Sequence, residues 1–366
     1  QAYVAAGPST DHESMTREEA LEKVRLGMYV LIRQATAAQN LRALVPAVTP
    51  ENARRFAFAT DDRHPHDLLE EGHIDHLVRM AMAEGLDPIT VIRMATLNAV
   101  EAFGLRDRGA IGPGRRADLV VTPTLEAFRA ALVFSGGALV AQEGVAVGTW
   151  PEPEVDDRAV RSSIHVDLEQ LSFRIPAAGS KLRVVGLIPD QVLTEMRIME
   201  ASIMEGEAVA DVGRDLLKLA TVERHHNTGN VGLGFVQGLG LKQGAIAGSV
   251  GHDCHNITVA GADDASMRAA VRAVKELGGG LVAVLGEQLL GSVSLPIGGL
   301  MSDQPVESVR AQLDALLEAV RVLGSPLHDP FMQLGFLALE VIPKLKLTDL
   351  GLVDVDAFDF VPLWVE

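Results

Sequence analysis

The sequence predicts a mixed α/β protein, in which alternating strands and helices are followed by a small β module and a larger α+β domain. Three observations support this fold class. Residues 1–104 alternate short apolar runs with helical patterns joined by short links, which is typical of a parallel sheet. Residues 105–150 are rich in glycine turns and short strands. Residues 160–366 contain many more strand patterns and two long helical ones.

Composition narrows the range of functions. The chain has 366 residues, enough for two or three domains, and 48% hydrophobic with 22% charged residues is typical of a globular protein. A net charge of −17 argues against a nucleic-acid partner or an anionic membrane surface. The longest apolar region, near 280–301, is interrupted by polar residues and glycines, so no membrane span is predicted. The single cysteine, Cys254, fits a reducing cytosol, and we expect a cytoplasmic protein.

The first 104 residues contain short predicted strands, each followed by a helix. The predicted strands cover residues 8–10, 28–32 and 56–59. A T-x-x-E capping box begins at Thr16, a T-x-x-Q box begins at Thr36, and Asp87 precedes Pro88 at the start of a third helix. The predicted helices cover residues 16–27, 36–44, 74–82 and 87–104. Strands joined by helices in this way are expected to lie parallel in one sheet.

The remaining sequence changes character twice. Residues 133–140 predict a hairpin around a Gly-Gly turn, and the proline-containing acidic run at 151–157 predicts a linker. Beyond the linker, the predicted strands are 183–188, 207–212, 216–223, 244–250, 256–260 and 280–285, and the predicted helices are 263–277 and 305–323. The glycine-rich stretch 229–234 lacks the order and the strand-to-helix setting of a nucleotide loop, so we reject that interpretation.

The strand at 56–59 ends abruptly in Asp61, Asp62, Arg63 and His64. Charged groups at the carboxyl end of a buried parallel strand are where α/β proteins place their chemistry. A solvated turn, whose aspartates cap the next helix, is the alternative that the local sequence leaves open.

A second polar cluster, Asp11-His12-Glu13, follows the first short strand. If the strands are consecutive in a βα-barrel, His12 and Asp61 lie at the same rim. Histidine and carboxylate ligands suit Zn²⁺, Fe²⁺ or Mn²⁺, and a carboxylate beside a metal-bound water can accept its proton. Two ligands are a weak signal, and His12 as a neighbour of a helix cap is the alternative.

The motifs of the chain, taken together, resemble the adenine deaminases of the amidohydrolase superfamily. The motifs that carry the resemblance are Asp11-His12-Glu13, Glu18-Glu19-Ala20-Leu21-Glu22-Lys23, Gly27-Met28, Thr60-Asp61-Asp62-Arg63-His64-Pro65, Glu70-Glu71-Gly72-His73-Ile74-Asp75-His76, Arg93-Met94-Ala95-Thr96-Leu97-Asn98, the run 107–121, Glu223-Arg224-His225-His226, His252-Asp253-Cys254-His255-Asn256, Gly299-Leu300-Met301-Ser302-Asp303 and Lys346-Leu347-Thr348-Asp349. The resemblance covers essentially the whole chain.

The resemblance implies a (β/α)₈ barrel with a binuclear metal site, a small β-sandwich and a family-specific C-terminal domain. In these terms residues 1–104 are the C-terminal part of the barrel, strands 6–8, residues 105–150 a β-sandwich segment, and residues 151–366 the C-terminal α+β domain. His12 corresponds to the strand-6 histidine ligand and Asp61 to the strand-8 aspartate, which binds metal and shuttles a proton. The implied reaction is hydrolysis of adenine to hypoxanthine and ammonia by metal-bound hydroxide, in purine salvage.

Two departures from the family pattern stand out. The ligands expected on strands 1, 4 and 5 have no counterpart, so we expect activity only with a missing N-terminal half of the enzyme as partner. Arg33-Gln34-Ala35-Thr36 replaces the usual Arg-Glu-Gly with Ser or Thr, which removes a carboxylate near the rim. Asp62 and Arg63 are candidate substrate-binding residues. His73, in the run after this loop, is expected to help hold it.

Histidines gather again in the second half of the chain, at 225–226 and at His252 and His255. Buried histidines that bond backbone carbonyls are one interpretation. The other places this cluster at the barrel mouth, where His226 and His255 would bind substrate.

The sequence is compatible with two other functions: another amidohydrolase reaction, such as opening a cyclic amide, and a non-catalytic assembly module. The expected partners are a small-molecule purine and a second copy of the chain in a homo-oligomer, with neither nucleic acid nor membrane. The metal of the expected binuclear site is Fe, Mn or Zn.

Overall fold

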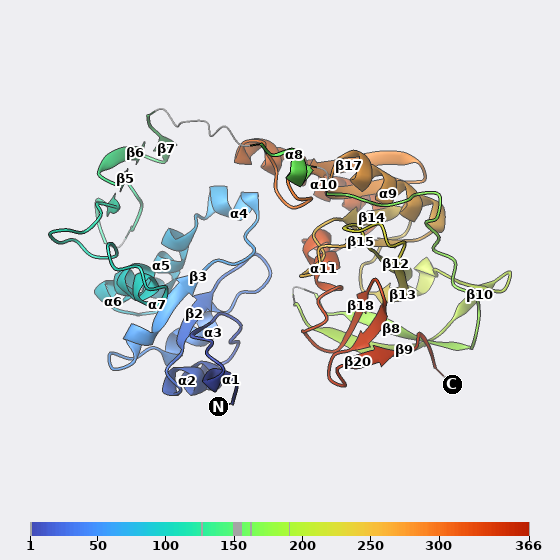
Figure 1. Cartoon of the computed structure of the whole chain (residues 1–366), viewed down its shortest axis with the longest axis horizontal. Helices are drawn as coiled ribbons and strands as arrows, with labels where there is room; N and C mark the ends of the chain where they lie inside the picture. The colour runs from blue at the N-terminus through green and yellow to red at the C-terminus, as the bar shows by residue number, and fades with distance from the viewer. Residues whose placement is uncertain (1, 126, 149–155, 162, 190, 366) are drawn as a thin grey trace. The chain divides into compact units, whose positions relative to one another are not determined.

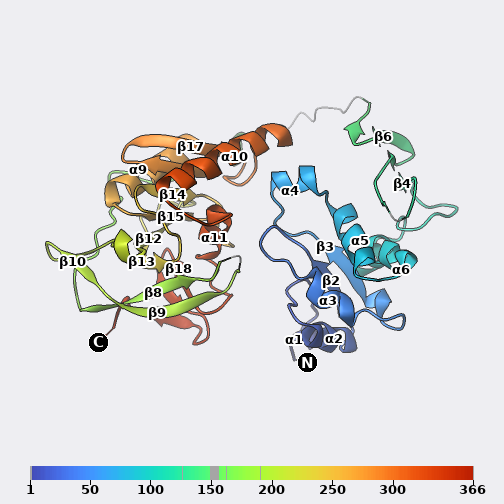
Figure 2. The same ribbon diagram turned by 180° about the vertical axis from the view of Figure 1, so that it is seen from behind.

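The chain forms two compact units, Gln1–Glu154 and Val155–Glu366, each with its own hydrophobic core (Figures 1 and 2). This computed structural model describes residues 2–365 except 126, 149–155, 162 and 190. The linker predicted at 151–157 therefore lies mostly outside the described residues. None of the helices in the described part is long and apolar enough to cross a bilayer.

Unit 1 is built on a three-stranded sheet. Its strands are β1 (Thr10–Asp11), β2 (Tyr29–Arg33) and β3 (Phe56–Ala59), in the order β1-β2-β3. Both pairings are parallel, with Thr10 opposite Tyr29 and Val30 opposite Phe56. The predicted parallel arrangement is confirmed, and all three carboxyl ends therefore lie at one edge of the sheet.

Short helices connect and cover these strands. They are α1 (Ala2–Ala5), α2 (Arg17–Arg25), α3 (Leu41–Leu44), α4 (Pro65–Glu70), α5 (Ile74–Ala83), α6 (Pro88–Ala95) and α7 (Leu97–Ala102), with 3-10 turns η1 (Val45–Ala47) and η2 (Ala53–Arg55). Ile32 and Phe56 of the sheet share a core with Leu77 of α5 and Met94 of α6, and all four are fully buried. The apolar spacing of α5 and α6 therefore turns one face of each helix toward the sheet.

Most helix signals in this unit are confirmed. Thr16 and Glu19 form the reciprocal capping box at the start of α2. The box predicted at Thr36 is wrong, because helix α3 begins only at Leu41 and its N-cap residue makes no side-chain cap. The Thr36 hydroxyl instead donates to Asp67 Oδ2 at 2.5 Å and accepts from the His64 backbone N–H at 2.9 Å.

The helix predicted over 87–104 is divided in two. Asp87 accepts from the Thr90 N–H and caps α6, as expected. The backbone then leaves helical geometry at Thr96, with φ −128° and ψ −84°, before α7 begins. Helix α6 buries Val91 and Met94 in the core, whereas the buried residue of α7 is Asn98, whose amide donates to the carbonyls of Ala53 and Phe56.

A four-stranded antiparallel sheet completes unit 1. Its strands are β4 (Leu119–Val121), β5 (Leu132–Ser135), β6 (Ala138–Gln142) and β7 (Val145–Ala146). Gly136 and Gly137, between β5 and β6, have φ of +57° and +88°. Two successive positive φ values are the requirement of a tight hairpin turn, and the predicted hairpin is confirmed.

Unit 2 is organised around a nine-stranded sheet in the order β17-β16-β14-β15-β12-β13-β8-β21, with β9 also paired to β8. The strands are β8 (Lys181–Leu187), β9 (Thr194–Glu200), β12 (Leu216–Val222), β13 (Val231–Gln237), β14 (Ala245–Gly248), β15 (Ile257–Gly261), β16 (Gly280–Leu285), β17 (Gln288–Ser294) and β21 (Trp364–Val365). All pairings are antiparallel except that of β13 with β8. The stretch 229–234 enters strand β13, in agreement with its rejection as a nucleotide loop.

Helices cover both faces of this sheet. Leu217 and Leu219 of β12 share a core with α10 (Val306–Leu323) and α11 (Pro330–Phe336). Ala220 and Val222 of the same strand share a second core with α9 (Asp264–Glu276). Side chains two apart on a strand face the same side, so the two cores lie on opposite faces.

Smaller elements surround this sheet. They are α8 (Arg158–Arg161), β10 (Ser202–Met204), β11 (Glu207–Val209), η3 (Val212–Arg214), β18 (Leu345–Thr348), β19 (Gly351–Asp354) and β20 (Asp359–Val361).

Candidate metal centre and a histidine-lined pocket

Three metal-binding side chains meet at the carboxyl edge of the unit 1 sheet. His12 and Glu13 follow β1, and Asp61 follows β3. The His12 Nε2 atom lies 3.2 Å from Glu13 Oε1 and 3.7 Å from Asp61 Oδ2. One ligand atom from each of the three residues lies within 4.8 Å of the others. The structure thus brings the two sequence-predicted ligands together and adds Glu13.

Arg33, the last residue of β2, joins the two carboxylates. Its Nη1 atom lies 2.9 Å from Glu13 Oε2 and 2.9 Å from Asp61 Oδ2, and its side chain is only 6% exposed. The guanidinium charge allows both carboxylates to approach the same space without mutual repulsion. In the sequence, Arg33 stands out only as part of the departure at residues 33–36. Its position at the end of the central strand was the signal that it faces the site.

Asp61 occupies a special backbone position. Its φ is +56°, a left-handed conformation that is uncommon for residues other than glycine and that aspartate tolerates better than most. Its Oδ1 atom accepts the N–H of Asp62 at 2.9 Å, while Oδ2 accepts from Arg33. Both carboxylate oxygens are therefore held, and the turn that follows β3 fixes the position of the side chain.

Asp62 and Arg63 lie on the same turn but have different surroundings. The Asp62 carbonyl accepts the N–H of Thr36 at 3.0 Å, which ties the turn to the loop after β2. The Arg63 side chain is 3% exposed, and it donates to the Gly72 carbonyl at 2.9 Å and to Glu71. Its contacts therefore hold the segment up to residue 72 against the turn.

His73 makes the contact that a role in holding this loop requires. Its Nε2 atom lies 3.0 Å from the Thr60 hydroxyl, directly before Asp61. On the other side of the sheet edge, Asp11 is engaged by Lys23 at 2.8 Å and by Ser14. Burial alone would raise the pKa of Asp11, but the hydrogen bonds from Lys23 and Ser14 lower it. Asp11 therefore supports the loop that carries His12 and Glu13.

In unit 2, Glu223 organises the loop that carries His225 and His226. Its carboxylate accepts the backbone N–H groups of both histidines and of Thr228, and also the Thr228 hydroxyl at 3.0 Å. Burial alone would raise the pKa of Glu223, but these hydrogen bonds lower it to about 2. The loop is therefore held on an ionised carboxylate.

Arg224 ties the same loop to three distant segments. It is 1% exposed and donates to the carbonyls of Ser163 and Gly298, each at 2.9 Å, and to that of His255. Burial lowers the pKa of Arg224. Residues that are far apart in sequence are brought together by this one side chain.

His252 and His255 are half-buried and take different roles. The His252 ring stacks on Phe336, with 4.8 Å between ring centroids and 22° between ring planes. The His255 Nδ1 atom is buried without a hydrogen bond in the described part of the chain, and burial lowers the pKa of His255. No set of three metal-binding groups is found among the described residues of unit 2.

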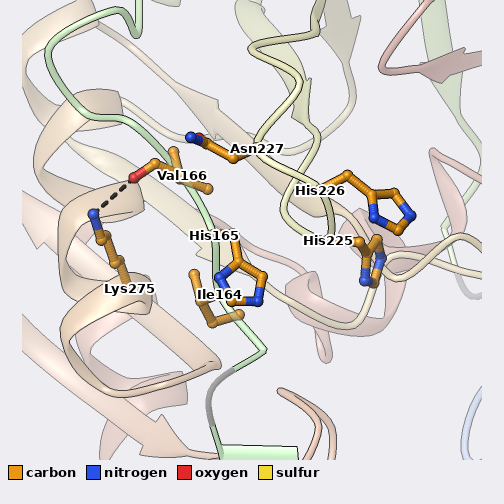
Figure 3. Close-up of a pocket in the computed structure, with 7 residues that line it drawn as sticks. All are labelled: Ile164, His165, Val166, His225, His226, Asn227 and Lys275. Carbon is orange, nitrogen blue, oxygen red and sulfur yellow. Dashed lines mark hydrogen bonds between the residues drawn. The ribbon is translucent and has the colours of Figure 1, made fainter.

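A pocket of about 480 Å³ opens beside the His225–His226 loop (Figure 3). It is lined by Ile164, His165, Val166, His225, His226, Asn227 and Lys275. The His165 ring lies between Lys275 and the other two rings in the view of Figure 3. His165, Asn227 and Lys275 carried no sequence signal, because the segments that hold them are brought together only by the fold.

Comparison with known proteins shows which proteins the chain resembles. The family model described as the adenine deaminase C-terminal domain matches residues 191–359, and that of the amidohydrolase family matches residues 3–148. An adenine deaminase of Desulfatibacillum aliphaticivorans is 54% identical over 364 residues, which is 100% of this chain. The chain is similar to adenine deaminases along its whole length. The resemblance predicted from the motifs is confirmed.

Further adenine deaminase relatives match along almost the whole chain. Adenine deaminase 2 of Carboxydothermus hydrogenoformans is 48% identical over 99% of the chain, and an adenine deaminase of Cereibacter sphaeroides is 45% identical over 98%. The chain spans 63–64% of the length of these relatives.

Among solved structures, a β-aspartyl dipeptidase of Fervidobacterium islandicum AW-1 matches 37% of this chain and 39% of its own, with 18% identity and a TM-score of 0.31. A likeness this weak supports no conclusion about the fold.

Proposed function

We propose that this chain is part of an enzyme that hydrolyses adenine to hypoxanthine and ammonia. The observation that carries the proposal is the convergence of His12, Glu13 and Asp61 at the carboxyl ends of parallel strands, in a chain about half identical to proteins named adenine deaminase. The relatives are longer, so the proposal includes a further segment that complements unit 1.

The donor atoms at this edge fit a divalent metal. An imidazole nitrogen and carboxylate oxygens are the ligands that Zn²⁺, Fe²⁺ and Mn²⁺ accept, and His12 and Asp61 would hold the ion, with Glu13 beside them. When bound, such a metal makes a water nucleophilic near neutral pH. Three groups are fewer than a binuclear site needs, and we propose that the complementary segment supplies the rest.

The residues around the metal ligands have distinct tasks in this proposal. Asp61 is the base that accepts the proton of the attacking water and passes it toward the departing amine. Arg33 holds the Asp61 carboxylate in place through its 2.9 Å contact. Asp62 would contact the purine from the same turn. Arg63 would act on the substrate indirectly, because its guanidinium is engaged in holding the loop.

The domain assignment follows from the same proposal. Residues 1–104 would be barrel strands 6–8, with β1, β2 and β3 as their counterparts, residues 105–150 a β-sandwich segment, and residues 151–366 the family's C-terminal domain. His226 and His255, from that last domain, would contact the substrate. We further propose a reducing cytoplasmic setting, a homo-oligomer and a role in purine salvage.

The test uses the chain together with the segment that completes its longer relatives. Adenine is incubated with the enzyme loaded with Fe, Mn or Zn, and hypoxanthine and ammonia are measured while metal content is determined by mass spectrometry. Asp61→Asn is expected to abolish turnover, and His12→Ala to reduce bound metal as well. Glu18→Gln, at an exposed acid of α2, is the control and should retain both. Hydrolysis of a cyclic amide but not of adenine, or no metal and no activity in the completed enzyme, would refute the proposal.

A further inference from the structure

We propose that the pocket beside the His225–His226 loop binds a purine base by itself, without the metal centre. The choice of a purine as ligand rests on the proposed function, whereas the pocket is defined by residues of unit 2 alone. Its volume of about 480 Å³ lies within the range of small-molecule sites.

The walls of the pocket suit a flat heteroaromatic ring. Three imidazole rings, those of His165, His225 and His226, line it together with the aliphatic side chains of Ile164 and Val166 (Figure 3). Imidazole and aliphatic surfaces pack against the face of a base, and this type of contact supplies much of the affinity for unstacked bases.

The polar edges offer both donors and acceptors. The His225 Nε2 atom lies 2.8 Å from the Cys254 carbonyl and must donate to it, so a neutral His225 ring leaves Nδ1 as an acceptor. The amide of Asn227 is exposed and makes no hydrogen bond within the described part of the chain. An amide can donate to and accept from adjacent positions of adenine or of hypoxanthine, which is the usual amide recognition of a purine edge.

The pocket is held in shape before any ligand binds. The backbone N–H of His165 donates to the Arg224 carbonyl at 2.7 Å, and that of His226 donates to Glu223 at 2.8 Å. Arg224 is itself anchored to Ser163 and Gly298. The backbone that carries the exposed rings therefore needs little ordering on binding.

Other ligand classes fit less well. The three histidines do not bring nitrogen atoms close enough for a metal, since no metal-binding group of three is found in the described part of unit 2. Among the lining residues Lys275 carries the permanent charge, and its ammonium donates to the Val166 carbonyl at 2.7 Å. A pocket with one engaged cation and two aliphatic side chains favours a neutral base over a phosphate.

The experiment measures adenine and hypoxanthine binding to the complete 366-residue chain after chelation of metal, by calorimetry and by the histidine C2–H resonances. Binding is expected in the metal-free chain and to the same degree in Asp61→Asn. Asn227→Asp, which keeps the size and the tolerance of positive φ, and His165→Leu should each weaken binding at least about tenfold. Gln243→Glu, at an exposed amide that does not line this pocket, should leave binding unchanged.

Several results would overturn the inference. The first two are that the base does not bind to the metal-free chain and that Asp61→Asn abolishes binding. The third is that Asn227→Asp and His165→Leu both bind the base as tightly as the wild type. The fourth is displacement of adenine by inorganic phosphate, which would mark an anion site. The proposed function fails separately. Deamination by the completed enzyme with no base binding to the metal-free chain leaves the function standing and removes this site. Base binding to the metal-free chain, with no ammonia released by the completed enzyme, supports this site and refutes the proposed function.

Discussion

At the scale of single residues, three charged side chains of unit 2 show how burial and hydrogen bonding set charge. Glu223 is stabilised as an anion by backbone N–H groups, and Arg224 beside it is a buried cation held by carbonyls. Lys346 is fully buried, and its ammonium donates to the carbonyls of Val192 and Phe336 at 2.9 Å. Burial lowers the pKa of Lys346 to about 7. The shifted pKa values of Glu223 and Lys346 make the stability of unit 2 depend on pH.

Glu223→Gln is expected to lower the free energy of unfolding by about 1–2 kcal/mol, because a neutral amide cannot accept four hydrogen bonds as a carboxylate does. The folded pKa is about 2, below the ordinary value of 4.5. The stability that ionised Glu223 contributes is therefore present above the ordinary pKa and is lost as the pH falls through the pKa of the folded state. Urea unfolding followed by tryptophan fluorescence should show that the difference in unfolding free energy between wild type and variant narrows in acid. Glu276→Gln, at an exposed acid of α9, should show no such difference.

Lys346→Met is expected to remove an increase in the free energy of unfolding at alkaline pH. The folded pKa of about 7 lies below the ordinary value of 10.5, so the unfolded chain binds more protons between these values. The free energy of unfolding of the wild type is therefore expected to rise as the pH increases from about 7 toward 10. Urea titrations across this range measure the slope. A wild-type slope that persists in Lys346→Met would contradict this assignment, and Lys181→Met, at an exposed position, serves as the control.

At the scale of elements, close packing of β13 makes one glycine irreplaceable. A Cβ added to Gly232 would lie 1.8 Å from the Thr348 carbonyl oxygen, where β18 ends. The strand also pairs with β12 along its full length, so it cannot move away without breaking that ladder. The glycine-rich pattern at 229–234 therefore serves backbone approach between elements of unit 2.

Gly232→Ala is accordingly expected to destabilise unit 2 by about 1–3 kcal/mol or to prevent its folding, because the clash is with backbone. Thermal unfolding monitored by circular dichroism gives the effect. Gly112→Ala is the matched control, since its added Cβ would meet no atom within 4 Å and its backbone carries no left-handed φ. Equal melting temperatures for the two variants would show that the 348–349 segment moves away from the added methyl group at little cost in free energy.

At the scale of the whole molecule, the sheets of the two units differ in how fully their faces are covered and their edges paired. Unit 2 has a nine-stranded sheet with helices packed on both faces. In unit 1, β1 and β3 each pair only with β2 among the described strands, so the parallel sheet has two unpaired edges. Parallel sheets are normally covered and extended, and open edges promote association with other chains.

Residues 156–366 are therefore expected to fold alone, whereas residues 1–148 should self-associate unless the complementary segment is present. Circular dichroism and analytical ultracentrifugation of the two fragments test this difference. A monomeric, cooperatively folded 1–148 fragment would show that three strands and their helices suffice.

The sequence by itself determined the α/β class, the parallel strands of unit 1, the approximate bounds of α2, α5, α9 and α10, and the positions of His12 and Asp61 at strand ends. These features follow from local periodicity, capping residues and turn glycines, which act over a few neighbouring positions. The tertiary structure alone decided that Arg33 bridges Glu13 and Asp61, that Thr36 binds the 64–67 segment instead of capping a helix, and that His165 joins His225 across sixty positions of chain. Such contacts depend on sheet order and on long-range packing, and no local pattern encodes which distant side chains will meet.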